Sequence, residues 1–275
     1  MKRILGAVAL SVCLAASSAS AAPGDPFGGS ETGCVPSGKA GLTCGKIITA
    51  GFGKLVASVV KCHLTQAAQA YKTGHSSTGF DNAEENCTLG NPTASAKAKF
   101  DALLAKANAI CPVGIVPVAE ARRDNFLGDT SVQNSLDSIN GVFFCDSTSG
   151  LSIAEPGGGD QDEGGSIPST PEHYKCSVAV AKLFSKLVAS VYKCHGKAAQ
   201  AIFAGKPFDT DACEETPTKG ARAKYEAKVQ KLVAAGICPP CLADPMSGAN
   251  VFAIGVGAVA ELDAQNEEVY PCPAP

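Results

Sequence analysis

The sequence has no tryptophan, two methionines and few aromatic residues, which make up 6% of its 275 positions. It also lacks the motifs of common catalytic sites: there is no Gly-x-Ser-x-Gly nucleophile turn, no G-x-x-x-x-G-K-S/T phosphate loop and no G-x-G-x-x-G dinucleotide fingerprint. One CxxC occurs, at 238–241, so a four-thiolate metal site lacks its second half, and the CxxCH of covalent haem is absent. We therefore expect no catalytic residues, no cofactor and no enzyme.

An excess of positive charge is missing as well. Basic residues number 23 and acidic residues 26, and loss of a leader containing Lys2 and Arg3 would leave 21 against 26, a net charge of −5. Proteins that bind nucleic acid are usually basic, so we expect no nucleic-acid partner. The hydrophobic fraction of 45% is that of a globular protein.

The first 21 residues have the pattern of a signal peptide. Met1-Lys2-Arg3 supplies the positive start, residues 4–16 are apolar, and Ala19-Ser20-Ala21 offers a cleavage site. The apolar run is shorter than the roughly 20 residues that span a bilayer, and no later segment looks long and apolar enough, so we expect no transmembrane span. The chain is therefore predicted to be secreted or periplasmic, with a lipoprotein anchored through Cys13 as the alternative.

Cleavage would remove one of 13 cysteines and leave 12. An even number of cysteines in an exported protein indicates disulfides rather than a metal site.

An internal repeat organises the mature chain. KLVASV at 54–59 recurs at 186–191, Lys-Cys-His at 61–63 recurs at 193–195, and AAQA at 67–70 recurs at 198–201. Five cysteines correspond in order between the copies. The predicted organisation is a flexible arm at 22–43, a first repeat at 44–145, a Gly-rich acidic linker at 146–171 and a second repeat at 172–275.

Each repeat has the pattern of a helical hairpin, so the predicted fold class is all-α. Apolar residues and cysteines fall on one helical face at positions 44, 48, 52, 55, 59 and 62, and at the six corresponding positions of the second copy. A second helix is predicted to begin at Asn91-Pro92 or Thr216-Pro217 and to run to Cys111 or Cys238. A third, weaker helical pattern covers 117–140 and 247–267.

Antiparallel packing of the first two helices predicts the disulfides. The start of one helix meets the end of the other, which gives Cys44–Cys111, Cys62–Cys87, Cys176–Cys238 and Cys194–Cys213. Cys34 and Cys241 lie at the same end of their hairpins, and we infer that each pairs with the tail cysteine of its copy, which gives Cys34–Cys145 and Cys241–Cys272. A bond between Cys145 and Cys272 is the alternative.

These paired cysteines resemble the twin-cysteine helical hairpins of mitochondrial intermembrane-space proteins. The similarity covers the two helices of each copy, whose 18-residue cysteine spacing is twice that of the family. It implies a stapled helical hairpin and no particular function.

His63 and His195 are the candidates for metal or haem ligands, because both copies keep Lys-Cys-His. Each follows a core-facing cysteine by about 100°, so we expect a surface imidazole that is dispensable. His75 and His173 have no corresponding partner and do not strengthen a site.

Two other groups of charged residues recur. Carboxylates cluster before each second helix, at Asp81, Glu84, Glu85, Asp209, Asp211, Glu214 and Glu215. They are predicted to form an acidic loop, with a hydrolytic carboxylate pair as the alternative. Lysines 54, 61, 186 and 193 form a stripe that is either a solvated face or a site for anionic glycans or lipids.

The sequence thus favours an exported, non-enzymatic, cysteine-rich binding or structural module whose partner is an unidentified protein or envelope component. A carrier of a metal, haem or small apolar ligand is the first alternative. A hydrolase that uses the loop carboxylates is the second.

Overall fold

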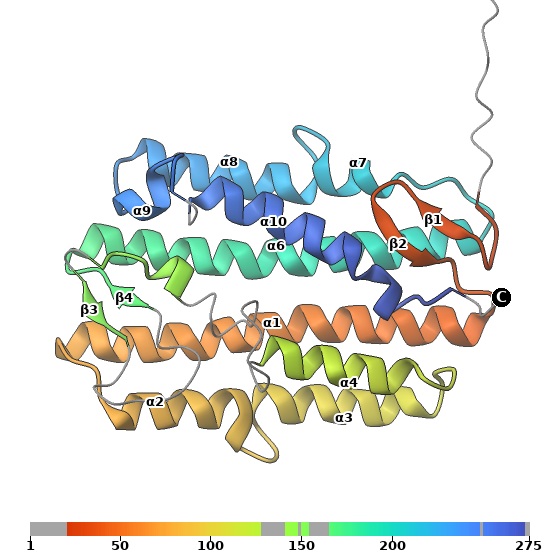
Figure 1. Ribbon diagram of the computed structural model, residues 1–275, viewed down its shortest axis with the longest axis horizontal. Helices are drawn as coiled ribbons and strands as arrows, with labels where there is room; N and C mark the ends of the chain where they lie inside the picture. The colour runs from red at the N-terminus through yellow and green to blue at the C-terminus, as the bar shows by residue number, and fades with distance from the viewer. Residues whose placement is uncertain (1–20, 128–140, 148–149, 154–164, 248–249, 273–275) are drawn as a thin grey trace, which may run out of the picture.

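The computed structural model describes residues 21–127, 141–147, 150–153, 165–247 and 250–272. It is mostly helical, as the sequence predicts. Two long helices form its centre: α1 (Lys39–Thr73) and α6 (Pro171–Phe203) lie side by side in Figure 1. They are antiparallel, because Gly53 lies against Ala189 while Lys46 reaches Gln200.

The central pair is extended into a layer of four helices. The helix α3 (Ala96–Asn108) lies beside α1, and α8 (Ala221–Ala234) lies beside α6. Two further helices, α4 (Ile115–Phe126) and α10 (Val251–Ala264), lie in front of this layer in Figure 1. Shorter helices connect these elements: α2 (Thr78–Glu85), the π-helix η1 (Asn86–Gly90), α7 (Thr210–Glu215), α9 (Pro240–Ala243) and the 3-10 helix η2 (Asn266–Glu268).

The predicted apolar stripes face the interior. All six positions of the stripe are buried in α1 and in α6. Aromatic rings join the two copies: Phe52 of α1 stacks on Tyr192 of α6 with ring centroids 5.6 Å apart, and it contacts Phe100 of α3 at 4.9 Å. The core is therefore shared between the copies.

The helix α1 requires one correction to the sequence analysis. By length and composition it is apolar enough to cross a bilayer, although no such segment was expected after the leader. Most of its apolar stretch is buried inside the molecule against α6 and α3. We therefore describe α1 as the central core helix.

The second helices begin later than predicted. Asn91 accepts hydrogen bonds from the backbone of Thr93 and Ala94, which closes a turn, and α3 begins only at Ala96 with Ser95 as its N-cap. The equivalent α8 begins at Ala221. The predicted third helices correspond to α4 and α10. Residues 128–140 of the first predicted span, 117–140, lie outside the described residues. Residues 1–20 of the predicted leader lie outside them as well.

The N-terminal arm is ordered, contrary to the expectation of a loose segment. Residues Pro26–Gly28 (β1) and Glu31–Cys34 (β2) pair as antiparallel strands. The arm packs against the end of the second copy: Cys34 N donates to Tyr270 O at 2.9 Å, and Asn266 donates to Thr32 O at 3.1 Å. Backbone bonding of this kind offsets the entropy lost on ordering a Gly-rich arm.

The linker ends are also paired, through the antiparallel strands β3 (Leu151–Ser152) and β4 (Ser166–Ile167). Residue 166 stands ten positions before Cys176, as Cys34 stands ten before Cys44. Ser166 bonds to Phe144 O beside Cys145, as Cys34 bonds to Tyr270 O beside Cys272. The segment preceding each copy thus packs on the tail of the other copy. The linker residues 154–164 lie outside the described residues.

Four disulfides have the pairing predicted from antiparallel hairpins, namely Cys44–Cys111, Cys62–Cys87, Cys176–Cys238 and Cys194–Cys213. The other two predictions, Cys34–Cys145 and Cys241–Cys272, are wrong. The structure has Cys34–Cys272 and Cys145–Cys241 instead. These pairings differ from the prediction because the copies exchange their leading segments, meaning that the segment before each copy packs on the tail of the other copy. The arm brings Cys34 to the tail of the second copy, and Ser166 occupies the equivalent position beside Cys145.

Peptide mapping of the oxidised, unreduced protein should recover fragments that join Cys34 to Cys272 and Cys145 to Cys241. Titration of the denatured, unreduced protein should find essentially no free thiol. Recovery of Cys34 linked to Cys145 would contradict the exchange.

Two glycines of α10 test its packing. A Cβ on Gly255 would lie 2.8 Å from the ring of Tyr225, whose hydroxyl donates to Val251 O in the interior. A Cβ on Gly257 would meet no atom within 4 Å. We expect Gly257→Ala to increase the free energy of unfolding by about 0.5–1 kcal/mol, and Gly255→Ala to decrease it by about 1–3 kcal/mol through overpacking. Chemical denaturation measures the free energy of unfolding of each variant. An equal change in both variants would contradict the close contact between Gly255 and the ring of Tyr225.

Candidate metal centre

The imidazole of His195 is buried, although the sequence analysis placed it on the surface. Its exposed fraction is 1%. The prediction failed because α7 folds over this part of α6 and covers the imidazole. The disulfide Cys194–Cys213 holds α7 there, and Cys194 is the residue next to His195. The predicted acidic loop is therefore a short helix that covers the histidine.

Two carboxylates bracket this imidazole. Nε2 of His195 lies 3.1 Å from Oε1 of Glu214 on α7 and 3.1 Å from Oδ1 of Asp263 on α10. Glu31 of β2 adds a third carboxyl group, and donor atoms of all four side chains lie within 4.8 Å of one another. We call Glu31, His195, Glu214 and Asp263 the tetrad.

Local structure positions each member of the tetrad. Asp209 caps α7 by accepting a hydrogen bond from Ala212 N at 2.8 Å, which sets the helix that carries Glu214. The hydroxyl of Thr32 donates to Asp263 O and Ala264 O, each at 3.0 Å, and this ties β2 to the end of α10. Four separate elements therefore converge on one point.

The tetrad leaves polar atoms unsatisfied. The side chain of Glu214 is fully buried, and its two oxygens have no hydrogen-bond donor among the described residues beyond the ion pair with His195, although the Asp263 carboxyl group lies close to them. Nδ1 of His195 and Oε1 of Glu31 also lack a partner within the described ranges. Buried polar atoms without partners are costly, so the arrangement favours an additional bound group.

The electrostatics of the tetrad indicate a shortage of positive charge. Burial raises the pKa of Glu214 to about 8, and burial likewise raises the pKa of Glu31 to about 7. Burial alone would lower the pKa of His195, but its hydrogen bonds with Asp263 and Glu214 raise it to about 9. One imidazolium does not compensate three buried carboxylates, so protons neutralise part of the site at neutral pH.

A cavity of about 560 Å³ adjoins the tetrad and shares Glu31 with it. Phe27, Ile202 and Phe208 form apolar walls, and Thr210 and Asp211 contribute polar groups. Asp211 also accepts a hydrogen bond of 2.7 Å from Ser30. The cavity therefore lies directly beside one member of the tetrad, Glu31.

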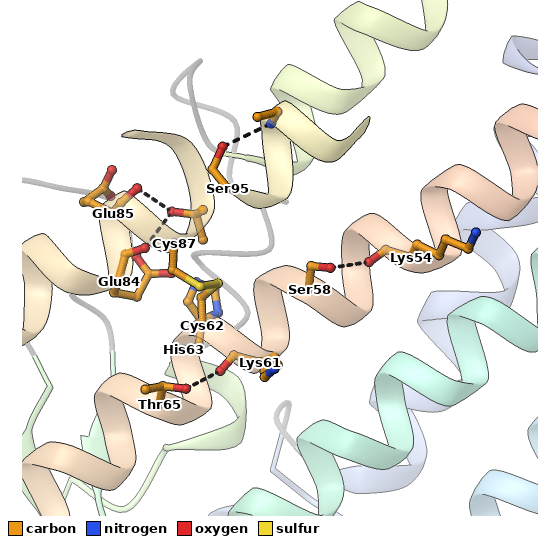
Figure 2. Close-up of a disulfide and its surroundings, with 12 residues drawn as sticks. Lys54, Ser58, Lys61, Cys62, His63, Thr65, Glu84, Glu85, Cys87 and Ser95 are labelled. Carbon is orange, nitrogen blue, oxygen red and sulfur yellow. Dashed lines mark hydrogen bonds and ion pairs between the residues drawn. A yellow bond between two sulfur atoms is a disulfide. The ribbon is translucent and has the colours of Figure 1, made fainter. Parts of the chain in front are cut away.

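The first copy has a related pair. His63 is also buried, with 3% of its surface exposed, and its Nε2 lies 3.3 Å from Oε1 of Glu84. Figure 2 shows His63 and Glu84 beside the Cys62–Cys87 disulfide, which joins α1 to η1. The expectation of a surface imidazole is therefore wrong for both histidines.

The remaining predicted residues do not join the tetrad. Asp209 caps its helix, and Glu215 is exposed and pairs with Arg222 at 2.7 Å. His75 is exposed in the loop after α1, and Nδ1 of His173 lies 3.2 Å from Oδ2 of Asp146. Asp81 and Glu85 lie in α2 of the other copy.

Glu31 and Asp263 are not among the residues predicted from the sequence, although the repeat carries a signal for both. Glu31 stands 13 residues before Cys44, and Glu163 stands 13 residues before Cys176. Leu262-Asp263 with Asn266 recurs as Leu136-Asp137 with Asn140. Residues 136–140 and 163 lie outside the described residues, so they enter only as a sequence correspondence.

No family model matches the chain, and neither does any curated protein or solved structure.

Replacement of His195 by Ala should destabilise the protein even without metal. It leaves Glu214 and Asp263 buried without their cation, and breaking a buried ion pair costs about 3 kcal/mol or more. The measurement is the free energy of unfolding in EDTA under oxidising conditions. His75→Ala, at an exposed position, is the matched control and should change it by less than about 0.5 kcal/mol. Equal stability of the two variants would show that the buried pairing contributes nothing.

Proposed function

We propose that this protein is an exported, non-enzymatic module that binds one divalent transition-metal ion at the tetrad. The observation that carries the proposal is the convergence of one imidazole and three carboxyl groups, all buried, with donor atoms within 4.8 Å of one another. Three or four protein donors are what a metal site requires.

The donor set supports a particular class of ion. An imidazole nitrogen suits Zn²⁺ and Fe²⁺, while carboxylate oxygens suit harder ions such as Mn²⁺. All 12 cysteines of the mature chain that the sequence predicts are in disulfides, so no thiolate is offered to a softer ion such as Cu⁺. We therefore propose a first-row divalent ion, Mn²⁺, Fe²⁺ or Zn²⁺, over Ca²⁺ or Mg²⁺.

Export is supported by the six disulfides, which are typical of an oxidising, extracellular environment. A disulfide-rich helical protein is compatible with a secreted structural or binding module. The absence of a recognisable catalytic motif in the sequence favours binding over catalysis. The bis-histidine haem alternative loses support, because each imidazole is engaged by a glutamate of its own copy.

Binding of the ion should depend on Glu214. Removal of its charge by Glu214→Gln keeps the shape of the side chain but takes away a carboxylate ligand. We expect the variant to lose one equivalent of bound Zn²⁺ or Mn²⁺, or to bind it at least about tenfold more weakly. Equilibrium dialysis with elemental analysis of the full-length, oxidised protein measures both quantities.

Glu215→Gln is the matched control, since it makes the same change one residue away at an exposed position that faces Arg222. It should bind like the unmodified protein. Circular dichroism of both variants establishes that each is folded. Identical metal content in Glu214→Gln and in the unmodified protein would overturn the proposal.

A further inference from the structure

Charge is strongly segregated in the four-helix layer. The helix α1 has no acidic residue in its 35 positions, and α6 has one, Glu172, in its first turn. Both helices nevertheless carry several exposed lysines. In a chain where acidic residues outnumber basic ones, this leaves an uncompensated positive face on the central helices.

Three adjoining hollows lie on this face. The first outer hollow, of about 360 Å³, lies between α1 and α3, and the second, of about 410 Å³, lies between α6 and α8. The middle hollow, of about 410 Å³, lies between α1 and α6. The hollows adjoin one another: Lys54 and Ala57 line the middle hollow and the first outer one, while Lys193 and Ala189 line the middle hollow and the second. All the described residues that line them belong to α1, α3, α6 or α8, and none belongs to α4 or α10. We call this surface the lysine face.

Lysines dominate the rim of these hollows, and none of the described residues that line them is acidic. The lysines are Lys46, Lys54, Lys61, Lys99, Lys186, Lys193, Lys197, Lys224 and Lys228. Each is exposed, and the ion pairs found among the described residues include none of them. Lys46 donates to the neutral side chain of Gln200 at 3.2 Å. The positive charge of the lysine face is therefore available to a partner.

The two outer hollows correspond residue by residue in the repeat. Ten lining positions of one match ten of the other, and they include Lys54 with Lys186, Lys61 with Lys193, and Lys99 with Lys224. Exposed positions of the same helices outside these two hollows differ between the copies, as Ala50 differs from Lys182 and Thr65 from Lys197. Helix formation does not require lysine at an exposed position. Retention of these lysines while neighbouring surface residues diverged points to a shared binding role.

We propose that the lysine face binds the surface of an anionic phospholipid bilayer. Lysines near an anionic leaflet attract it as point charges, whereas bidentate recognition of a single anion favours arginine. No arginine is found among the described residues that line the hollows. The hollows extend over four helices, so their lysines are spread over a broad surface, which suits an extended anionic surface rather than a single small anion. The exposed large apolar residues lie elsewhere, so the contact is electrostatic and does not insert.

Figure 2 shows part of this face, where Lys54, Ser58 and Lys61 follow one another along α1. Ser58 donates to Lys54 O at 2.8 Å, and its counterpart Ser190 donates to Lys186 O at 2.7 Å. These bonds keep both hydroxyls on the helix and leave the ammonium groups as the charged contacts. No member of the tetrad lines the three hollows, so this proposal stands apart from metal binding.

Sedimentation with vesicles tests the proposal on the full-length, oxidised protein. The probes are phosphatidylcholine vesicles with and without about 30 mol% phosphatidylglycerol. We expect binding to the anionic vesicles alone, weakening as salt rises from about 0.05 to 0.5 M. Each lysine near an anionic leaflet increases the partition coefficient about fivefold. The double variant Lys54→Gln with Lys193→Gln alters all three hollows. It should therefore bind the anionic vesicles about 25-fold more weakly.

Lys206→Gln with Lys219→Gln is the matched control, because it removes the same charge from exposed loop positions outside the lysine face. It should bind almost like the unmodified protein. Equal weakening by the two double variants would overturn the proposal, since net charge alone would then account for binding. Retention on dextran sulfate without binding to the anionic vesicles would also overturn it and assign the face to a polysaccharide.

Discussion

The close antiparallel contact between α1 and α6 is the interaction on which the rest of the structure depends. The two helices approach so closely at Gly53 that an added Cβ would lie 3.3 Å from Ala189. Small residues at this crossing let the apolar stripes of both copies merge into one core, in which Phe52 of the first copy stacks on Tyr192 of the second. A hairpin of about 100 residues buries a modest core by itself, and the shared core enlarges it.

The exchange of leading segments follows from this arrangement. Once α1 and α6 lie antiparallel, the start of α1 is near the end of the second copy, so the strand β2 meets Tyr270 and Asn266 rather than its own repeat. Glu31 reaches His195 by this route. The tetrad therefore belongs to neither copy alone. Glu31 comes from the N-terminal arm, before the first repeat, and the other three residues come from the second repeat.

The features that the sequence predicts are those that depend on local periodicity. The cysteine and apolar spacing of residues 44–62 is enough to predict a helix, the antiparallel hairpin and the four disulfides within the hairpins. It could not predict the partner of Cys34, because that depends on how the copies pack against each other. The burial of His195 was missed for the same kind of reason: helical angle alone places it beside the core, and α7 then covers it. Glu31 and Asp263 are 164 and 68 residues from His195, so nothing local connects them.

The two disulfides that differ from expectation also change what the linker does. Cys34–Cys272 joins the N-terminal arm to the second copy, and Cys145–Cys241 joins the first copy to the second. A protease that cuts the connecting segment between the copies therefore cannot release either half, because two covalent bonds still hold them together. The polypeptide link between the repeats is in this sense redundant once the protein is oxidised. A nicked, oxidised molecule would keep its shared core and would fall into two chains only on reduction.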